Sequence, residues 1–282
     1  MFSRIRYFLK RIIPFVFLLL TCYFITLLFL LCFENKLVFR PNNVTTFRID
    51  PSSSQTFQDI FLEDSQGQTI HAKWFPYTNA ESTVLFCHQN NANLSIHLPV
   101  EHIQKWHNEM HMSVLIFDYP GYGKSEGNPS EQGCYEAAEL SYKWLTDQQY
   151  ISADTILIVG RSLGTAVAVH LAAKYDHQAL VLVSPFTSLP DAVGACYPIW
   201  PAQYWMTNQF DSMAKINKCS RPILMFHGTK DNRVPIALGK QLFDSASKPK
   251  RFITVTGADH GDAVLKNFYG ELKQFLQDEV KN

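Results

Sequence analysis

Short apolar runs that alternate with helix-like stretches constrain the fold of this chain more than any other feature. Each run holds five or six mostly apolar residues, and the runs cover 83–87, 113–118, 155–160, 179–184, 222–227 and 252–256. Runs of this length and composition are typical of strands that are buried on both faces of a parallel sheet. They predict a sheet whose middle strands have no solvent-facing side.

Helix-like stretches separate these runs. They cover residues 94–107, 130–148, 163–175, 235–246 and 261–279. Strands that alternate with helices predict a doubly wound α/β sheet. Ahead of them, residues 57–62 and 69–75 alternate apolar and polar side chains around Gly67, as the strands of a hairpin do. We therefore expect residues 57–282 to form one mostly parallel α/β domain.

Residues 12–33 form an uncharged apolar segment. A helix needs about 20 such residues to cross a bilayer, so we expect one transmembrane helix here. Residues 1–11 form a basic flank, and residues 34–56 are expected to be a linker that leads off the membrane. Arg4, Arg6, Lys10 and Arg11 precede the segment, whereas Glu34, Lys36 and Arg40 follow it. This excess of positive charge on the N-terminal side predicts a single-pass protein with a cytoplasmic N-terminus and the α/β domain on the opposite side.

Two other interpretations of residues 12–33 remain open. One is a cleaved signal peptide, which usually has a shorter apolar core followed by small residues at the cleavage site. The other is a wholly buried core helix. We favour the retained anchor because the segment is long, is apolar on every face and lacks such a cleavage site.

A candidate nucleophile lies where one apolar run ends. Residues 160–164 read Gly-Arg-Ser-Leu-Gly, directly after the run and directly before an Ala-rich helical stretch. A sharp turn between a strand and a helix presents a serine hydroxyl at the C-terminal edge of the sheet. The glycines allow so tight a turn. Ser162 is the predicted nucleophile, and the alternative is an ordinary turn that contains a serine.

A serine hydroxyl needs a base, and the base needs a carboxylate that orients it. Asp231 follows the run 222–227, and His260 follows the run 252–256. The order Ser, Asp, His suits this type of sheet, and the C-terminal ends of its strands share one edge. We therefore predict a catalytic triad of Ser162, Asp231 and His260.

The neighbours of the predicted triad have simpler interpretations. His227 precedes a glycine at a strand end and is expected to be structural. Asp259 is expected to be a loop residue, and Asp262 a residue at a helix start, where carboxylates are favoured. Asp231 could itself be a turn carboxylate that accepts hydrogen bonds from nearby backbone N–H groups.

Five segments together resemble a known family. They are residues 117–127 (FDYPGYGKSEG), 160–164 (GRSLG), 184–188 (SPFTS), 227–231 (HGTKD) and 259–261 (DHG). These segments resemble the membrane-anchored α/β-hydrolase-domain proteins, which are related to serine aminopeptidase-like hydrolases. The resemblance extends over most of residues 35–280 and implies the α/β-hydrolase fold. Its members include esterases, lipases, thioesterases that act on lipidated proteins, and peptidase-like enzymes.

An oxyanion hole needs two backbone N–H groups aimed at the developing negative charge. Leu163, next after the predicted nucleophile, would supply one of them. The resemblance places the other in the loop after residues 83–87, where the family has His-Gly-Asn-Ala. Here the loop reads His-Gln-Asn-Asn-Ala over 88–92, so Asn90 would donate by position. Gln89 carries a side chain where the family has glycine. Two outcomes are open: the loop shifts or the pocket narrows, or this side chain points away from the site.

Residues 186–213 interrupt the alternation and are the expected cap. Asp191 and Asp211 are their only charged residues. The aromatic residues are Phe186, Tyr197, Trp200, Tyr204, Trp205 and Phe210. One hypothesis is that they line an acyl pocket, which needs apolar walls. The alternatives are that they pack the cap onto the sheet, or that they touch the bilayer surface.

Composition narrows the function further. The formal net charge of +0 gives no electrostatic case for nucleic acid binding. No Cys-x-x-Cys pair or zinc-like Cys/His spacing occurs, so no metal or organic cofactor is implied. We therefore expect a serine hydrolase (carboxylesterase, thioesterase or lipase-like) that acts on an ester or thioester of a small acyl or lipid substrate near a membrane. An aminopeptidase-like serine hydrolase and a catalytically weak, membrane-bound binding module remain as alternatives.

Overall fold

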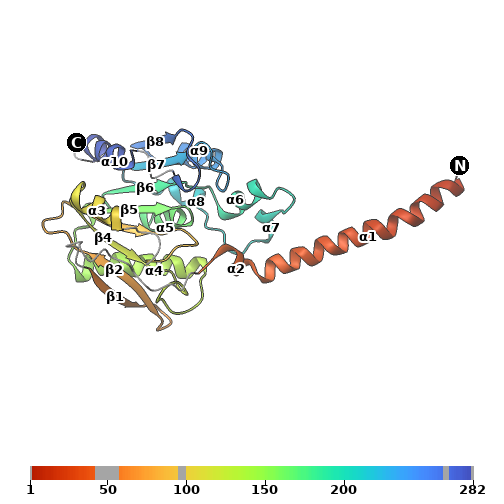
Figure 1. Ribbon diagram of the computed structural model, residues 1–282, viewed down its shortest axis with the longest axis horizontal. Helices are drawn as coiled ribbons and strands as arrows, with labels where there is room; N and C mark the ends of the chain where they lie inside the picture. The colour runs from red at the N-terminus through yellow and green to blue at the C-terminus, as the bar shows by residue number, and fades with distance from the viewer. Residues whose placement is uncertain (1, 42–56, 95–99, 263–266, 281–282) are drawn as a thin grey trace.

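An eight-stranded sheet forms the centre of the α/β domain (Figure 1), and its strand order is β1-β2-β4-β3-β5-β6-β7-β8. The computed structural model describes residues 2–41, 57–94, 100–262 and 267–280. The strands are β1 (Gln58–Glu63), β2 (Thr69–Phe75), β3 (Ser82–Cys87), β4 (Met112–Phe117), β5 (Ile156–Arg161), β6 (Ala179–Val183), β7 (Ile223–Gly228) and β8 (Lys250–Val255). The hairpin β1–β2 is antiparallel and β2 joins β4 antiparallel, whereas all the other neighbours are parallel. All eight predicted strands are therefore present.

Helices cover both faces of the sheet, as the alternation predicts. Helices α4 (Glu131–Lys143), α5 (Leu163–Ala172) and α9 (Ile236–Ser245) pack on one face, and α3 (Val100–Asn108) and α10 (Phe268–Glu279) on the other. Every residue of β4, β6 and β7 is buried, because each side of these strands meets a helix layer. The mostly parallel, doubly wound sheet predicted from the sequence is confirmed.

Three helix boundaries differ from the predictions. Helix α3 begins at Val100 and α10 at Phe268, later than the predicted starts at 94 and 261. Parts of those predictions, 95–99 and 263–266, lie outside the described residues. The predicted helix 130–148 continues beyond α4 as one π-helical turn, η1 (Trp144–Gln148). These differences affect helix ends only and leave the layers unchanged.

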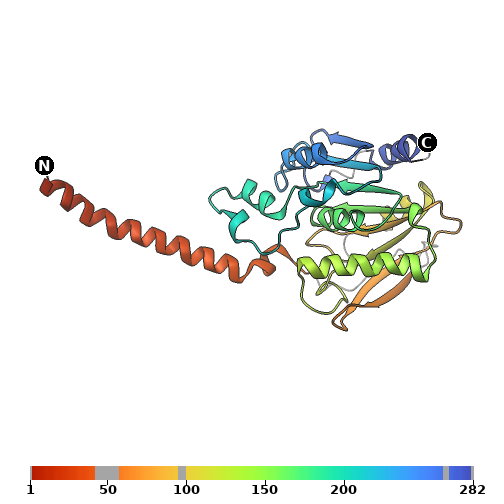
Figure 2. The ribbon, with the colours of Figure 1, turned by 180° about the vertical axis from the view of Figure 1, so that it is seen from behind.

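The N-terminal segment is one long helix, α1 (Phe2–Cys32), that projects from the domain (Figures 1 and 2). It begins ten residues before the predicted span because the basic flank continues the helix, so Pro14 lies in its interior. The stretch Lys10–Cys32 is long and apolar enough to cross a membrane, and only 6% of its most apolar window is buried. Most of its large side chains are therefore exposed, whereas Leu27, near its end, is buried.

Residues 34–40, predicted as the start of a linker, instead pack on the domain. Glu34–Val38 form helix α2, and the Phe39 side chain is fully buried against Phe210 with 6.0 Å between ring centroids. A buried phenylalanine at this position fixes the chain where a linker would leave it free. The rest of the predicted linker, 42–56, lies outside the described residues.

The predicted cap, 186–213, contains α6 (Leu189–Cys196) and α7 (Ala202–Trp205), and α8 (Met213–Ile216) begins at its end. Ser188 caps α6 by accepting a hydrogen bond from the N–H of Asp191, and Pro190 lies in the first turn of the helix, where proline is well tolerated. Both views place α6 and α7 beside the C-terminal part of α1 (Figures 1 and 2). The cap therefore lies between the domain and the apolar helix.

Candidate active site

The predicted nucleophile occupies a strained turn between β5 and α5. Ser162 has φ 51° and ψ −121°, a backbone conformation that a residue with a side chain rarely adopts. The surrounding structure holds it there, since its N–H donates to the carbonyl oxygen of Val183 at 2.9 Å. Such strain costs on the order of 1–3 kcal/mol and is characteristic of functional sites.

The two glycines of the turn are required because backbone atoms of neighbouring residues approach them closely. A Cβ atom at residue 160 would lie 2.5 Å from the carbonyl oxygen of Gly164. A Cβ atom at residue 164 would lie 2.1 Å from the carbonyl oxygen of Cys87, at the end of β3. Both neighbours are backbone atoms that cannot move aside cheaply. The Gly-x-Ser-x-Gly spacing therefore reflects packing of α5 against the sheet edge.

The structure brings the three predicted residues together in one hydrogen-bonded chain. Nε2 of His260 lies 2.9 Å from Oγ of Ser162, and its Nδ1 lies 2.8 Å from Oδ2 of Asp231. Asp231 also accepts hydrogen bonds at Oδ1 from the N–H groups of Arg233 (3.0 Å) and Val234 (2.8 Å). The carboxylate thus holds its own turn with one oxygen and the imidazole with the other. The two roles that the sequence left as alternatives coexist.

The electrostatics of Asp231 suit this arrangement. Burial by itself would raise the pKa of the carboxyl, but the hydrogen bond and charge of His260 and the N–H of Val234 outweigh burial, so its pKa lies below the ordinary value. An ionised Asp231 can only accept, so Nδ1 of His260 carries the proton. Nε2 is then left to accept the hydrogen of the Ser162 hydroxyl, as a general base must.

The neighbouring titratable residues have structural roles. Nε2 of His227 donates to the carbonyl oxygen of Val234 at 2.8 Å, and burial lowers the pKa of this histidine, which keeps it neutral. Oδ1 of Asp259 accepts hydrogen bonds from the N–H groups of Gly261 (2.7 Å) and Asp262 (3.1 Å) and so forms a turn. His227 and Asp259 therefore match their predicted roles.

The two predicted oxyanion donors line the cavity that Ser162 also lines. Leu163 is the first residue of α5, so its N–H has no partner within the helix. Three hydrogen bonds of Asn90 hold its loop in place. The carbonyl oxygen of Asn90 accepts from the Tyr122 hydroxyl (2.6 Å) and from the N–H of Arg40 (3.2 Å), and Nδ2 of Asn90 donates to the carbonyl oxygen of Val38 (2.9 Å). Leu163 and Asn90 both line the same pocket as Ser162.

Gln89 does not occupy the pocket. Its Nε2 donates to Oδ1 of Asn91 at 3.0 Å, within the same loop. Among the described residues that line the pocket, Asn90 and Asn91 are present and Gln89 is not. Of the two outcomes left open by the sequence, a side chain that points away from the site is the one observed.

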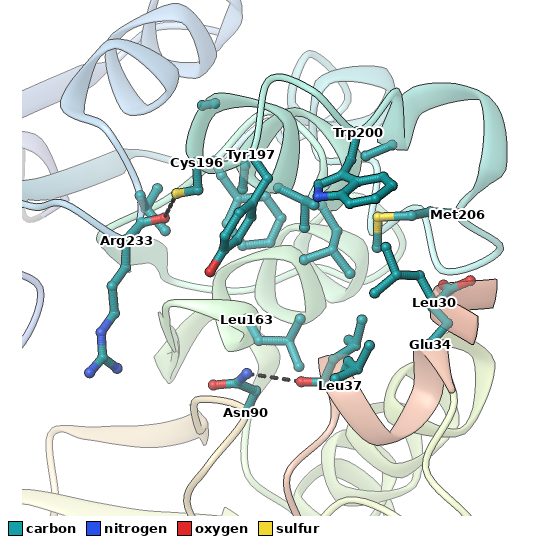
Figure 3. A pocket seen from close by; sticks show the side chains of 18 of the residues that line it. Leu30, Glu34, Leu37, Asn90, Leu163, Cys196, Tyr197, Trp200, Met206 and Arg233 are labelled. Carbon is teal, nitrogen blue, oxygen red and sulfur yellow. Dashed lines mark hydrogen bonds between the residues drawn. The ribbon is translucent and has the colours of Figure 1, made fainter. Parts of the chain in front are cut away.

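Ser162 and His260 open into a cavity of about 990 Å³. Its walls come from four parts of the chain: the end of α1, α2, the cap, and the loops at the C-terminal edge of the sheet. Figure 3 shows Leu163 and Asn90 on one side of the cavity, Leu30 of α1 and Glu34 of α2 on another, and Tyr197 and Trp200 of the cap opposite Asn90. Most of the lining side chains are apolar. In the described part of the chain, no group of three or more His, Cys, Asp or Glu side chains is placed to hold a metal ion.

Comparisons with known proteins place this chain in a family. An uncharacterized protein of Mycobacterium tuberculosis is 36% identical over 220 residues, which are 76% of this chain and 77% of that protein. The human alpha/beta hydrolase domain-containing protein 17B is 32% identical over 209 residues, which are 72% of this chain and 69% of that protein. This chain belongs to the alpha/beta hydrolase family. The family model described as alpha/beta hydrolase fold matches residues 82–205 of this hydrolase.

Solved structures share the fold of this hydrolase. An esterase of Pyrococcus furiosus, Pf2001, superposes with a TM-score of 0.71 at 16% identity and covers 85% of this chain and 97% of its own. Est1E of Butyrivibrio proteoclasticus, solved with ferulic acid bound, superposes with a TM-score of 0.66 at 18% identity and covers 79% and 100% of the two chains. The predicted family resemblance and the α/β-hydrolase fold are confirmed.

Sequence reasoning missed two residues that support the site of this hydrolase. Nη2 of Arg161 donates to the carbonyl oxygen of Gly261 at 2.8 Å and so connects the serine turn to the loop that carries His260. Glu34 lies in the cavity wall and joins α2 to the cap through five hydrogen bonds. Arg161 occupies a variable position of its motif and Glu34 follows an apolar segment, so neither carried a signal of its own.

The close approach at Gly164 gives a stability prediction for this hydrolase. Gly164→Ala should destabilise the domain by about 3 kcal/mol, because the added methyl group collides with backbone at the end of β3. Gly194→Ala in α6 is the matched control, since a Cβ atom there would have no atom within 4 Å. Thermal unfolding followed by circular dichroism should show a lower Tm only for Gly164→Ala. Equal Tm values for both variants would contradict the packing argument.

Proposed function

We propose that this protein is a serine hydrolase that cleaves ester or thioester bonds of a small acyl or lipid substrate. One observation carries the proposal. A hydrogen-bonded chain from Asp231 through His260 ends at the strained Ser162, whose hydroxyl faces a large, mostly apolar cavity. Each member of the chain lies within the distance that proton transfer requires.

The geometry supports the following mechanism. The hydroxyl oxygen of Ser162 attacks the acyl carbonyl carbon while Nε2 of His260 takes its proton. Asp231 orients the imidazole and stabilises its positive charge. The N–H groups of Leu163 and Asn90 would donate to the oxyanion. The imidazolium then protonates the leaving alcohol or thiol, and water, activated by the same base, hydrolyses the acyl-enzyme.

The cavity favours an acyl substrate over an amino-terminal peptide. An aminopeptidase-like enzyme needs a carboxylate that can pair with the substrate amine. Of the described residues that line the cavity, Glu34 is the only carboxylate, and both of its oxygens accept hydrogen bonds from Thr207 and Asn208. An amine would have to displace these bonds. Ester and thioester substrates with apolar acyl chains need no such partner.

We also propose that α1 anchors the enzyme as a single membrane span, with the N-terminus cytoplasmic and the hydrolase domain on the opposite side. The apolar length of Lys10–Cys32 and the basic residues before it support this orientation. A reporter that is active only in the cytoplasm, fused to either end of the full chain, tests it. Activity at the N-terminal fusion alone is expected, and activity at the C-terminal fusion alone would overturn the orientation.

A panel of acyl esters and thioesters of graded chain length tests the substrate class. We expect turnover by the wild-type protein and none above background by Ser162→Ala protein prepared in the same way. Preference for apolar chains over short polar acyl groups would support the cavity as the acyl site. Turnover of aminoacyl amides without turnover of any ester or thioester would instead favour the aminopeptidase-like alternative.

The cap makes a prediction about chain length. Trp205 lines the cavity, and its replacement by alanine removes a large part of the apolar wall. Trp205→Ala should therefore change the preferred acyl length, with the ratio of kcat/KM for long and short chains shifting by about tenfold, the effect of one or two methylene groups in an apolar pocket. An unchanged ratio would mean that Trp205 only packs the cap.

A further inference from the structure

The cap reaches far along the apolar helix. The ring of Trp200 stacks on that of Tyr23 in α1, with 5.2 Å between centroids and 8° between planes. The Tyr23 hydroxyl lies 3.5 Å from the carbonyl oxygen of Ile199 and donates to it. Tyr23 precedes the end of α1 at Cys32 by nine residues, a rise of about 14 Å at 1.5 Å per residue. Because a bilayer core is about 30 Å thick, this contact lies near its middle if α1 spans it.

The outer surface of the cap is apolar where it meets this helix. Ile199 and Tyr204 are 72% and 77% exposed, and neither lines the cavity. Between Asp191 and Asp211 the sequence contains no charged residue. Large apolar side chains grouped on one exposed surface mark an interaction site, and tyrosine and tryptophan are enriched where proteins meet lipid.

We propose that the tip of the cap, residues 197–206, is immersed in the leaflet next to the hydrolase domain, and that the cavity takes acyl chains directly from the lipid. The occupant of this apolar surface is the hydrocarbon of the bilayer that α1 crosses. The contact between Trp200 and Tyr23 carries the proposal, since a cap that touches the middle of a membrane span must lie in the membrane beside it. The inference rests on the proposed membrane span and deepens the proposed function.

Polar residues mark where both segments leave the membrane. Glu34 lies two residues after the end of α1 and is buried. Its carboxylate accepts hydrogen bonds from the N–H of Thr207 (2.9 Å) and of Asn208 (2.8 Å) and from Nδ2 of Asn208 (2.7 Å), directly after the cap tip. Burial raises the pKa of Glu34, but these hydrogen bonds outweigh it and hold the pKa below the ordinary value. The anchor and the cap are thus tied together at one level, by a group that stays charged.

Part of the cavity wall comes from the two segments that we place in the lipid. Leu27, Leu30 and Leu31 of α1 form one part of this wall, and Trp200 and Met206 of the cap form another. Ser162 lines the same cavity. An acyl chain that slides between α1 and the cap would therefore reach the serine without passing through water.

Quenching of tryptophan fluorescence by lipids brominated on their acyl chains tests the immersion. Trp74, Trp106 and Trp144 are buried in the domain core, whereas Trp200 and Trp205 belong to the cap. In vesicles of brominated phosphatidylcholine, part of the tryptophan fluorescence of the full-length protein should be quenched. The double variant Trp200→Phe/Trp205→Phe lacks both cap tryptophans, so its remaining fluorescence should not be quenched. Equal quenching of both proteins, or none in either, would overturn the proposal.

Flotation with vesicles and hydrolytic activity distinguish this proposal from the proposed membrane span and the proposed function. Failure of the protein to float with the vesicles would overturn the membrane span and the immersed cap together. Floating protein that is quenched as expected but hydrolyses nothing would keep the immersed cap and overturn the proposed function. The quenching itself does not depend on catalysis.

A second pair of variants tests the consequence for substrate supply. Ile199→Asp/Tyr204→Asp places charge on the surface outside the cavity, which should push the cap out of the lipid. Turnover of an acyl ester embedded in vesicles should fall by about tenfold or more, while turnover of a short, water-soluble ester stays unchanged. Tyr150→Asp is the matched control, because Tyr150 is 86% exposed ahead of β5, at the opposite end of the strand from Ser162. Unchanged turnover of the embedded ester in the double variant would overturn the lateral entry.

Discussion

Replacing Ser162 with alanine is expected to lower kcat by about a millionfold, as removal of the catalytic serine does in subtilisin. The variant loses the one hydroxyl that lies within 2.9 Å of Nε2 of His260, so the imidazole has no nucleophile to activate. Burst and steady-state rates with an ester from the panel give the measurement. The loss should appear in kcat, since the substitution leaves the proposed acyl-binding cavity unchanged.

Two controls make this result specific. The Tm of Ser162→Ala should stay close to that of the wild type, because both residues must adopt the same strained conformation. Ser141 is a buried serine whose hydroxyl donates to the carbonyl oxygen of Ala137 within α4 at 2.8 Å and which does not line the cavity, so Ser141→Ala is the matched variant. A loss of activity in Ser141→Ala as large as that in Ser162→Ala, or a Ser162→Ala protein that remains active, would contradict the assignment.

The second large effect is expected for Asp231→Asn, with kcat lower by about ten-thousandfold. Asparagine keeps an oxygen that can accept from the N–H groups of Arg233 and Val234, so the turn should remain folded. Its amide then faces Nδ1 of His260 as a donor and favours the imidazole tautomer with the proton on Nε2. That tautomer cannot accept the hydrogen of Ser162. The decrease should be measured at several pH values with one ester.

Asp259→Asn is the control for this change. Asp259 lies beside His260, but its contacts are with backbone N–H groups of its own turn, which an asparagine oxygen can also accept. Its activity should remain within about threefold of the wild type, as expected for a substitution that preserves its hydrogen bonds. If Asp259→Asn were as damaging as Asp231→Asn, the orienting carboxylate would be misassigned.

The sheet and the candidate site were predictable because they depend on short, local patterns. Apolar runs mark buried strands regardless of what surrounds them, and the C-terminal ends of parallel strands share an edge. Ser162, Asp231 and His260 each follow such a run, so their convergence required only the strand order of a doubly wound sheet. Gly164 followed from the same logic, since a tight turn before a helix excludes a Cβ atom.

The role of Glu34 was not predictable, because its partners Thr207 and Asn208 lie 173 and 174 residues away. A glutamate that follows an apolar segment looks the same in the sequence whether it begins an exposed linker or accepts hydrogen bonds in a buried contact. Phe39 was assigned to a linker for the same reason, although it packs in the domain core. Contacts that depend on where the cap folds back cannot be read from residues 34–40 alone.

Reaction with a fluorophosphonate, followed by mapping of the modified residue, determines whether Ser162 is the activated nucleophile. Folded wild-type protein should gain one covalent adduct, and fragmentation of its peptides should place the adduct on Ser162. The Ser162→Ala protein should gain none under the same conditions. An adduct on another residue in the wild type, or no adduct on folded protein that is otherwise intact, would contradict the account.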